Sequence, residues 1–452
     1  MQTNKNASET RLGTEPINKL MLSMGIPTLI AQLINLLYNI VDRIYIGQGV
    51  GREALTGVGL TLPIITLISA FSSFAGAGAA PLATIALGKN EKEHAKKILG
   101  NTCSMLLFFT VLVMAVFYSI EKPFLFLVGA STDTWPYAHD YLMIYLAGTL
   151  FVQLVIGLNS FITAQGKSKM AMAAILTGAI ANIILDPIFI FGFQMGVKGA
   201  AAATVLSQFF SACVVMRFLL SKETSLRLER RCLKPDFAII KGSLALGISP
   251  FIMQSTESLI SVVLSSGLQI YGNDLYVGSL TILQSVMLLI NAPIQGFTQG
   301  VQPILSYNFG AGNISRVRET YRKIIGITAI ASCIITASAM LFPRLYARIF
   351  TQDATLIEVI GQVMPIFLGG MLIFGIQMGC QTTFMGLGQA KISLFIALLR
   401  KVFLLVPFAI LFPKITGNVI SIYYAECAAD TLAASICGII FLCHIKKILN
   451  RA

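Results

Sequence analysis

An aspartate followed directly by a proline interrupts a long apolar stretch, ANIILDPIFIFG, at residues 181–192. A carboxylate at mid-membrane depth costs about 2.5–3.5 kcal/mol on insertion scales, and the proline removes a backbone hydrogen bond from the same helix. Asn182 lies four residues before Asp186, so the amide and the carboxylate stack on one helix face. The carbonyl group freed by Pro187 would add a third oxygen ligand. This group predicts a site for a sodium ion or a proton, with Pro187 as a hinge whose bend depends on occupancy.

Other apolar segments contain polar residues that recur with helical spacing, and the stripe in the first segment ends at Asp42. Polar groups in hydrocarbon need partners or water, so these faces should point into the protein. Hydrogen bonding between helices is the simpler explanation for a single Gln or Asn, whereas a carboxylate points more strongly to function. We expect a substrate cavity lined by Gln32, Asn35, Asn39, Gln254, Glu257, Gln284, Asn291 and Gln295.

The composition identifies the elements that must position these groups. Of the 452 residues, 56% are hydrophobic and only 12% are charged, whereas a soluble domain has about 25% charged residues. A bilayer core requires about 20 apolar residues per helix. The sequence therefore predicts an all-α polytopic membrane protein with twelve transmembrane helices, at about 17–46, 54–80, 95–119, 138–160, 168–192, 197–220, 242–270, 278–304, 321–343, 356–382, 391–412 and 417–445.

The chain repeats one plan twice. Shifting the sequence against itself by 222 residues aligns six pairs of glycines, among them Gly25 with Gly247 and Gly88 with Gly310. We predict an amino-terminal lobe at 1–220, a cytoplasmic linker at 221–241 and a carboxy-terminal lobe at 242–452. Because six spans return the chain to the same membrane face, the two six-helix bundles should be related by a pseudo-twofold axis along the membrane normal. Such an arrangement suits alternating access in a secondary transporter.

The basic residues are unevenly distributed between alternate loops. With the N-terminus placed in the cytoplasm, 24 of the 33 Lys and Arg residues fall on the cytoplasmic side and six on the other. The positive-inside rule then predicts a multi-pass protein of the cell (inner or plasma) membrane with both termini in the cytoplasm. The net charge of +13 is explained by topology, so we expect no nucleic-acid partner. We expect the protein to contact membrane lipids and to be a monomer.

Several chemistries are not expected. The eight cysteines show no CxxC or Cys/His spacing, so we predict no metal site beyond a possible sodium ion and no cofactor. The chain contains no Walker A motif for nucleotide hydrolysis. An intramembrane aspartyl protease would need a GxGD-type motif, and the nearest match, GLGQ at 386–389, has glutamine in place of the acid. The chain is therefore not expected to be an enzyme.

The sequence resembles the multidrug and toxic compound extrusion (MATE) family over essentially its whole length. The most specific segments are LLYNIVDRIYIG (36–47), ANIILDPIFIFG (181–192), MGVKGAAAATVLSQ (195–208) and GVQPILSYNFGAGN (300–313). They are similar to the subgroup that has a cation site in its amino-terminal lobe. The resemblance implies an outward-directed exporter of drug-like, often cationic compounds that is driven by influx of sodium ions or protons.

The resemblance also implies roles for individual residues. The coupling-ion site would comprise Asp42, Asn182, Asp186 and Thr204, and Pro27 would be a hinge in the first span. Glu257 matches a seventh-span glutamate that another branch uses in a carboxy-lobe ion site. The tenth span, MLIFGIQMGCQTT, contains no acid to complete that site. We therefore interpret Glu257 as the charge that attracts cationic substrates into the cavity.

Two basic residues keep a second function open. Arg400 and Lys401 fall inside the eleventh span, where they could snorkel or pair with a carboxylate. A cavity lined by them would favour anions instead. The alternative function is therefore a flippase for a lipid-linked saccharide of the same superfamily. The oxygen ligands of the predicted ion site do not by themselves distinguish sodium from protons.

Overall fold

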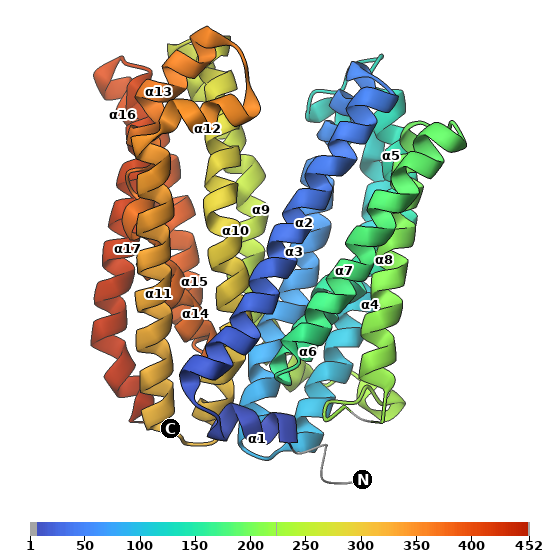
Figure 1. Cartoon of the computed structure of the whole chain (residues 1–452), viewed down its shortest axis with the longest axis vertical. Coiled ribbons are helices and arrows are strands. Elements are labelled where there is room, and N and C mark those ends of the chain that lie inside the picture. Colours follow the sequence, from blue (N-terminus) through green and yellow to red (C-terminus); the bar gives the residue numbers. More distant parts are fainter. Residues whose placement is uncertain (1–6, 223, 451–452) are drawn as a thin grey trace.

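The computed structural model describes residues 7–222 and 224–450, and this part of the chain is almost entirely helical (Figure 1). Its first half begins with a short helix, α1 (Ala7–Thr14), and continues as a bundle of long helices. That bundle consists of α2 (Ile17–Gly49), α3 (Arg52–Gly88), α4 (Lys92–Leu127), α5 (Trp135–Ala147), α6 (Thr149–Ala164), α7 (Ser168–Pro187), the π-helix η1 (Ile188–Gly192) and α8 (Val197–Leu220).

The second half follows a connecting segment that contains a short 3-10 helix, η2 (Arg230–Leu233). Its bundle repeats the order of the first and adds a short helix, α12, near one end. It consists of α9 (Phe237–Tyr271), α10 (Asp274–Gly310), α11 (Ile314–Leu341), α12 (Pro343–Phe350), α13 (Ala354–Leu368), α14 (Met371–Gly386), α15 (Ala390–Leu398), the π-helix η3 (Leu399–Leu405), α16 (Val406–Thr416) and α17 (Ile420–Leu449).

The described residues form ten continuous helices that are long and apolar enough to cross a membrane, and two bent helix pairs bring the number of spans to twelve. The prediction of an all-α polytopic protein with twelve spans in two bundles is confirmed. One bend, of 57°, separates α5 from α6 at Gly148, and the other, of 42°, separates α13 from α14 at Gly369 and Gly370. Gly148 and Gly370 are 222 residues apart, so even this irregularity occurs in both halves.

Contacts between the lobes follow the same repeat. A Cβ atom on Gly88 would lie 2.1 Å from the carbonyl oxygen of Tyr307, and a Cβ on Gly310 would lie 2.1 Å from that of Ile85. Adding 222 to 85 and 88 gives 307 and 310, so these two contacts are symmetry mates. Only glycine allows backbones to approach this closely, and small residues are common where membrane helices pack. Gly88 and Gly310 thus lie where the two lobes meet.

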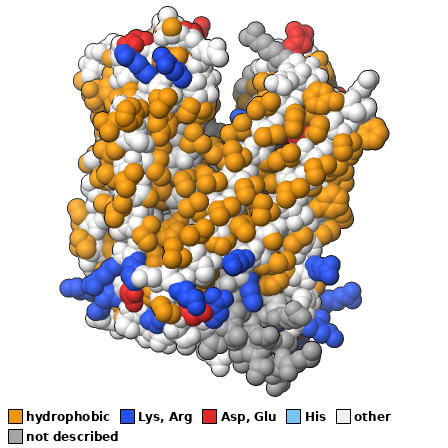
Figure 2. Space-filling view, in the orientation of Figure 1, with side chains coloured by type: hydrophobic (Ala, Val, Ile, Leu, Met, Phe, Trp, Pro, Cys, Tyr) orange, Lys and Arg blue, Asp and Glu red, His pale blue; other side chains and the backbone are white. Residues whose placement is uncertain are grey.

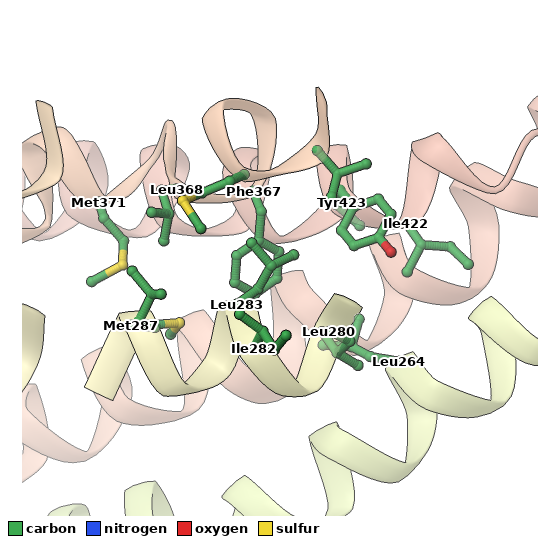
Figure 3. Close-up of a cluster of buried hydrophobic side chains, with 14 of the residues drawn as sticks. Leu264, Leu280, Ile282, Leu283, Met287, Phe367, Leu368, Met371, Ile422 and Tyr423 are labelled. Atoms are coloured by element: carbon green, nitrogen blue, oxygen red, sulfur yellow. The ribbon is translucent and has the colours of Figure 1, made fainter. Parts of the chain in front are cut away.

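The first helix of each lobe also packs on the other lobe. Leu20 and Met24 of α2 are buried in one apolar cluster with Val301 of α10. At the equivalent place Ile239 of α9 joins a cluster of the amino-terminal lobe. Each lobe has a further core of its own, and that of the carboxy-terminal lobe joins residues of α9, α10, α13, α14 and α17, such as Phe367 and Tyr423 (Figure 3).

Figure 2 shows a cleft between the lobes at one end of the molecule, whereas Lys and Arg side chains gather around the other end. Helix α1 and the last turns of α17 lie toward that basic end in Figure 1. Between the two ends, many large apolar side chains are exposed, including Leu37, Phe108 and Leu442. Such a surface is suited to lipid. The helices extend beyond several predicted spans, as in α3 and α10.

Candidate ion and substrate sites

Three helices of the amino-terminal lobe bring the predicted ion ligands together. The Asn182 Nδ2 atom of α7 donates to Asp186 Oδ1 at 3.2 Å, one turn along the same helix. It also faces Thr204 Oγ1 of α8 at 3.5 Å. The side chain of Asp186 is completely buried, and Asn182 is nearly so. The amide therefore links an acid and a hydroxyl group at a depth where an isolated charge is costly.

Asp42 of α2 completes this group. Its carboxyl group lies beside the Asp186 carboxyl group, and the two repel each other when both are ionised. Within the described residues, Asp42 Oδ1, Asn182 Oδ1 and Asp186 Oδ2 are buried and accept no hydrogen bond. Two adjacent carboxylates in a low-dielectric interior need a positive partner or a shared proton. The donor set of carboxylates, an amide oxygen and a hydroxyl group suits a proton or a sodium ion.

Sequence reasoning missed two tyrosines beside this group. Tyr38 of α2 lies beside Gln208 and interacts electrostatically with Asp42 and Asp186. Tyr141 of α5 lies beside Thr204. Tyr38 lies one turn before Asp42, so the periodicity that identified the polar stripe could have included it. Tyr141 comes from a different span and gave no comparable signal.

The structure differs from the kink predicted at Pro187. Helix α7 ends at Pro187 and continues directly as the π-helix η1, so residues 168–192 form one span without a sharp break. Wider π turns accommodate a residue that cannot donate a hydrogen bond to the regular ladder. The wider turn follows Asp186 immediately, so the irregular backbone lies beside the acid. Pro187 as an occupancy-dependent hinge stays a prediction.

Pro27 lies inside the continuous helix α2 and is buried. Its neighbour Gly25 packs against α10, where a Cβ would lie 2.5 Å from the Phe297 ring. A Cβ on Gly300 would lie 2.0 Å from Thr28 Oγ1. The predicted hinge therefore sits where α2 crosses the other lobe. Bending there would alter the contact between the lobes, as a hinge requires, although bending itself stays a prediction.

The residues predicted to line a substrate cavity lie on α2, α9 and α10, the helices at the contact between the lobes. Gln254 donates to Ser73 Oγ of α3 at 2.8 Å, across the two lobes. Gln284 accepts from Ser261 at 3.4 Å within one lobe. On α2, Gln32 packs against α10, and Asn39 donates a hydrogen bond to the backbone carbonyl group of Asn35. On α10, Asn291 has a buried side-chain oxygen without a partner among the described residues, and Gln295 is half-buried.

Glu257 is paired with a base that the sequence left unassigned. Its Oε2 atom lies 2.7 Å from Lys401 Nζ. The Glu257 side chain is 56% exposed, whereas that of Lys401 is 4% exposed. Glu257 is thus an accessible carboxylate whose charge is compensated from inside the lobe, and its role in attracting cationic substrates stays a prediction.

Arg400 is paired with two acids of α17 that the sequence analysis overlooked. Its Nε atom lies 2.5 Å from Asp430 Oδ1 and its Nη2 atom lies 3.4 Å from Glu426 Oε1. The guanidinium group also lies 4.5 Å from the centre of the Phe374 ring. All three charged side chains are buried. Glu426 and Asp430 lie four residues apart within an apolar span, which is the signal that identified Asn182 and Asp186.

Two similar bundles of membrane-crossing helices, with buried acids and a cleft between them, define a polytopic membrane transporter of the two-lobe type. The MatE family model matches residues 27–188 and 249–411, one segment in each lobe. The chain therefore belongs to the MATE family of membrane transporters, and it is not an enzyme.

Relatives and solved structures agree with this assignment. The chain is 26% identical to "Multidrug export protein MepA" of Staphylococcus haemolyticus over 80% of this chain and 79% of that protein. It is 24% identical to MepA of Staphylococcus aureus strain NCTC 8325 over 85% of each chain. A structure described as the outward-facing conformation of a multidrug resistance MATE family transporter matches 98% of both chains with a TM-score of 0.90 at 24% identity. A MOP superfamily transporter of Pyrococcus furiosus, described as having a binding pocket of reverse polarity, matches 97% of this chain and 98% of its own, also with a TM-score of 0.90 and 24% identity.

Proposed function

We propose that this transporter exports drug-like, mainly cationic compounds in exchange for protons or sodium ions. The observation that supports this most is the pair formed by the half-buried Asp42 and the completely buried Asp186, which makes no salt bridge with a basic side chain of the described residues. The exposed Arg43 acts on Asp42 only through a longer-range electrostatic interaction. A cation that binds to the pair removes the repulsion between the two carboxylates and changes how α2 and α7 pack. The ligand thereby favours one arrangement of the helices over another, as coupling requires.

The orientation follows from the charges. With the basic end of the molecule in the cytoplasm, both termini are cytoplasmic and the cleft of Figure 2 opens outward. Glycine contacts such as Gly88 with Tyr307 then close the cytoplasmic end. Alternating access would open these contacts and close the outer cleft, with each lobe moving largely as a unit. The printed names of the relatives, multidrug export proteins, support the same direction of transport and small-molecule substrates.

The flippase alternative requires basic groups that face the cavity and meet a pyrophosphate. Arg400 is engaged by two acids and Lys401 by Glu257, so neither presents an uncompensated positive charge. The observation therefore favours cationic over anionic substrates. Drug accumulation in cells with and without the transporter separates the two functions, because a flippase would leave accumulation unchanged.

Asp42→Asn tests the ion site directly. Because the variant removes one of the two carboxylates, the pair no longer needs a cation, and we expect substrate-evoked ion movement to fall by about tenfold or more, the equivalent of about 1.4 kcal/mol of lost coupling. The measurement is the movement of protons and of sodium ions across proteoliposome membranes when ethidium is added. Ion movement equal to that of the parent protein would remove Asp42 from the coupling site.

Glu257→Gln tests the preference for cations. The half-exposed carboxylate should favour positively charged substrates, so its loss should reduce efflux of cationic dyes by about threefold to tenfold, the range expected for a partly exposed charge pair. Efflux of neutral compounds by the same cells should change little. An equal loss for both kinds of compound would show that Glu257 has no part in selecting charge.

A further inference from the structure

Five charged side chains of the carboxy-terminal lobe form a continuous group, here called the carboxy-lobe charge cluster. It consists of Glu257 on α9, Arg400 and Lys401 on η3, and Glu426 and Asp430 on α17. In a regular α-helix, adjacent residues point about 100° apart. The wider turn of the π-helix η3 allows both Arg400 and Lys401 to reach this cluster.

The charges of this cluster do not balance. Three acids face two bases, which leaves one surplus negative charge when all five are ionised. The surplus lies on α17, because Glu426 Oε2 and Asp430 Oδ2 are buried and accept no hydrogen bond from the described residues. Lys401 and Glu257 both interact electrostatically with Glu426. The acids of α17 can therefore accept a further positive group, and the ammonium group of Lys401 lies nearby.

The cluster occupies the counterpart of the amino-lobe ion site. Subtracting 222 from the numbers of Glu426 and Asp430 gives Thr204 and Gln208, which lie beside Asn182 and Tyr38. The register holds here, because Gly370 packs on Cys427 as Gly148 packs on Val205. The acids of the amino-lobe site thus form no salt bridge among the described residues, whereas the carboxy-lobe charge cluster contains cations of its own.

The two members of the pair between Glu257 and Lys401 differ in their surroundings. Glu257 is 56% exposed and Lys401 is 4% exposed, so the carboxylate is accessible from outside the lobe while the ammonium group approaches it from within the lobe. A cationic substrate that reaches Glu257 must compete with Lys401. If Lys401 stayed in place, the substrate would meet a neutralised acid. If Lys401 left without a partner, a buried ammonium group would be exposed to a large desolvation cost.

We propose that Lys401 is an internal counter-ion that leaves Glu257 when the cationic group of a substrate binds there, and that Glu426 and Asp430 receive it. This inference builds on the proposed function, since it assumes cationic substrates. The flexible four-carbon stem of a lysine permits such a transfer between neighbouring acids. The site then stays compensated in both states. Neutral compounds gain nothing from the exchange, so Lys401 sets the strength with which cations are selected.

Equilibrium binding of tetraphenylphosphonium to the purified full-length transporter in detergent tests this role. Lys401→Met removes the competitor, so we expect tetraphenylphosphonium to bind about threefold to tenfold more tightly. Glu426→Gln removes the surplus charge that receives Lys401, so binding should weaken by a similar factor. When Glu426→Gln is combined with Lys401→Met, it should weaken binding little, because no ammonium group needs to move. Lys401→Arg, which keeps the positive charge, should bind no more tightly than the parent.

Uncharged triphenylphosphine oxide is the matched probe, and its binding should be the same in all variants. The inference is overturned if Lys401→Met binds tetraphenylphosphonium no more tightly than the parent. It is also overturned if Glu426→Gln weakens binding equally with and without Lys401, since Glu426 would then act only as a nearby charge. A parent protein that binds neither probe would contradict the proposed substrate class, and this inference with it. If the parent binds tetraphenylphosphonium and Lys401→Met binds it with the same affinity, only this inference is contradicted and the proposed function is not.

Discussion

Cells that express Asp186→Asn should clear ethidium no faster than cells without the transporter. The substitution keeps the size of the side chain and its ability to accept a hydrogen bond from Asn182, so the local fold should be retained. It removes one of two adjacent buried carboxylates, and with it the repulsion that makes the site require a cation. Without that requirement, ion binding no longer biases the arrangement of α2 and α7, and uphill export stops.

Asp140→Asn is the matched control for this loss. Asp140 lies in the same lobe, but its side chain is 39% exposed and its partner, Lys198, is also at the surface, 3.4 Å away. Exposed pairs of this kind contribute about 0–1 kcal/mol. The control should be expressed and should clear ethidium like the parent. Clearance by Asp186→Asn at the rate of the control would show that the ion site has been assigned to the wrong residue.

The second large effect concerns stability. Arg400→Met should lower the free energy of unfolding by about 3–5 kcal/mol, because it leaves Asp430 and Glu426 buried with no cation in direct contact. Unfolding by added SDS in mixed micelles, followed by circular dichroism, measures the loss. Adding Asp430→Asn to Arg400→Met should restore a large part of it, since the remaining buried charge is then smaller.

Arg344→Met serves as the comparison for Arg400→Met. Arg344 also forms a direct ion pair, 2.9 Å from Glu358, but both side chains are more than half exposed. Its loss should cost about 0–1 kcal/mol. If the two arginine variants unfold at the same SDS fraction, the buried pairs of Arg400 do not stabilise the lobe as described.

Much of the architecture could be predicted from the sequence because it depends on local composition. A run of about 20 apolar residues specifies a membrane helix whatever its neighbours. The repeat was visible because Gly88, Gly247 and Gly310 meet backbone from the other lobe, and Gly25 meets the Phe297 ring, so that a larger residue would not fit at these positions. Asn182 and Asp186 were found together because four residues separate them on one helix.

The remaining features depend on which helices become neighbours. The partners of Arg400 and Lys401 lie on α17 and α9, 30 and 144 residues away in the chain, and no local pattern specifies such contacts. The same holds for Tyr141 beside Thr204. Glu426 and Asp430 are different, since buried acids in an apolar span can be recognised from sequence. Their relation to Glu257 could be recognised only from the fold, which brings Lys401 close to both Glu257 and Glu426.

The central claim is that export depends on a small cation that binds the pair Asp42 and Asp186. Its most direct test is ethidium efflux from vesicles with pH and sodium gradients imposed one at a time, in the parent and in the double variant Asp42→Asn with Asp186→Asn. We predict that at least one gradient drives efflux in the parent and that neither does so in the double variant. Gradient-driven efflux that survives the loss of both carboxylates would contradict the claim.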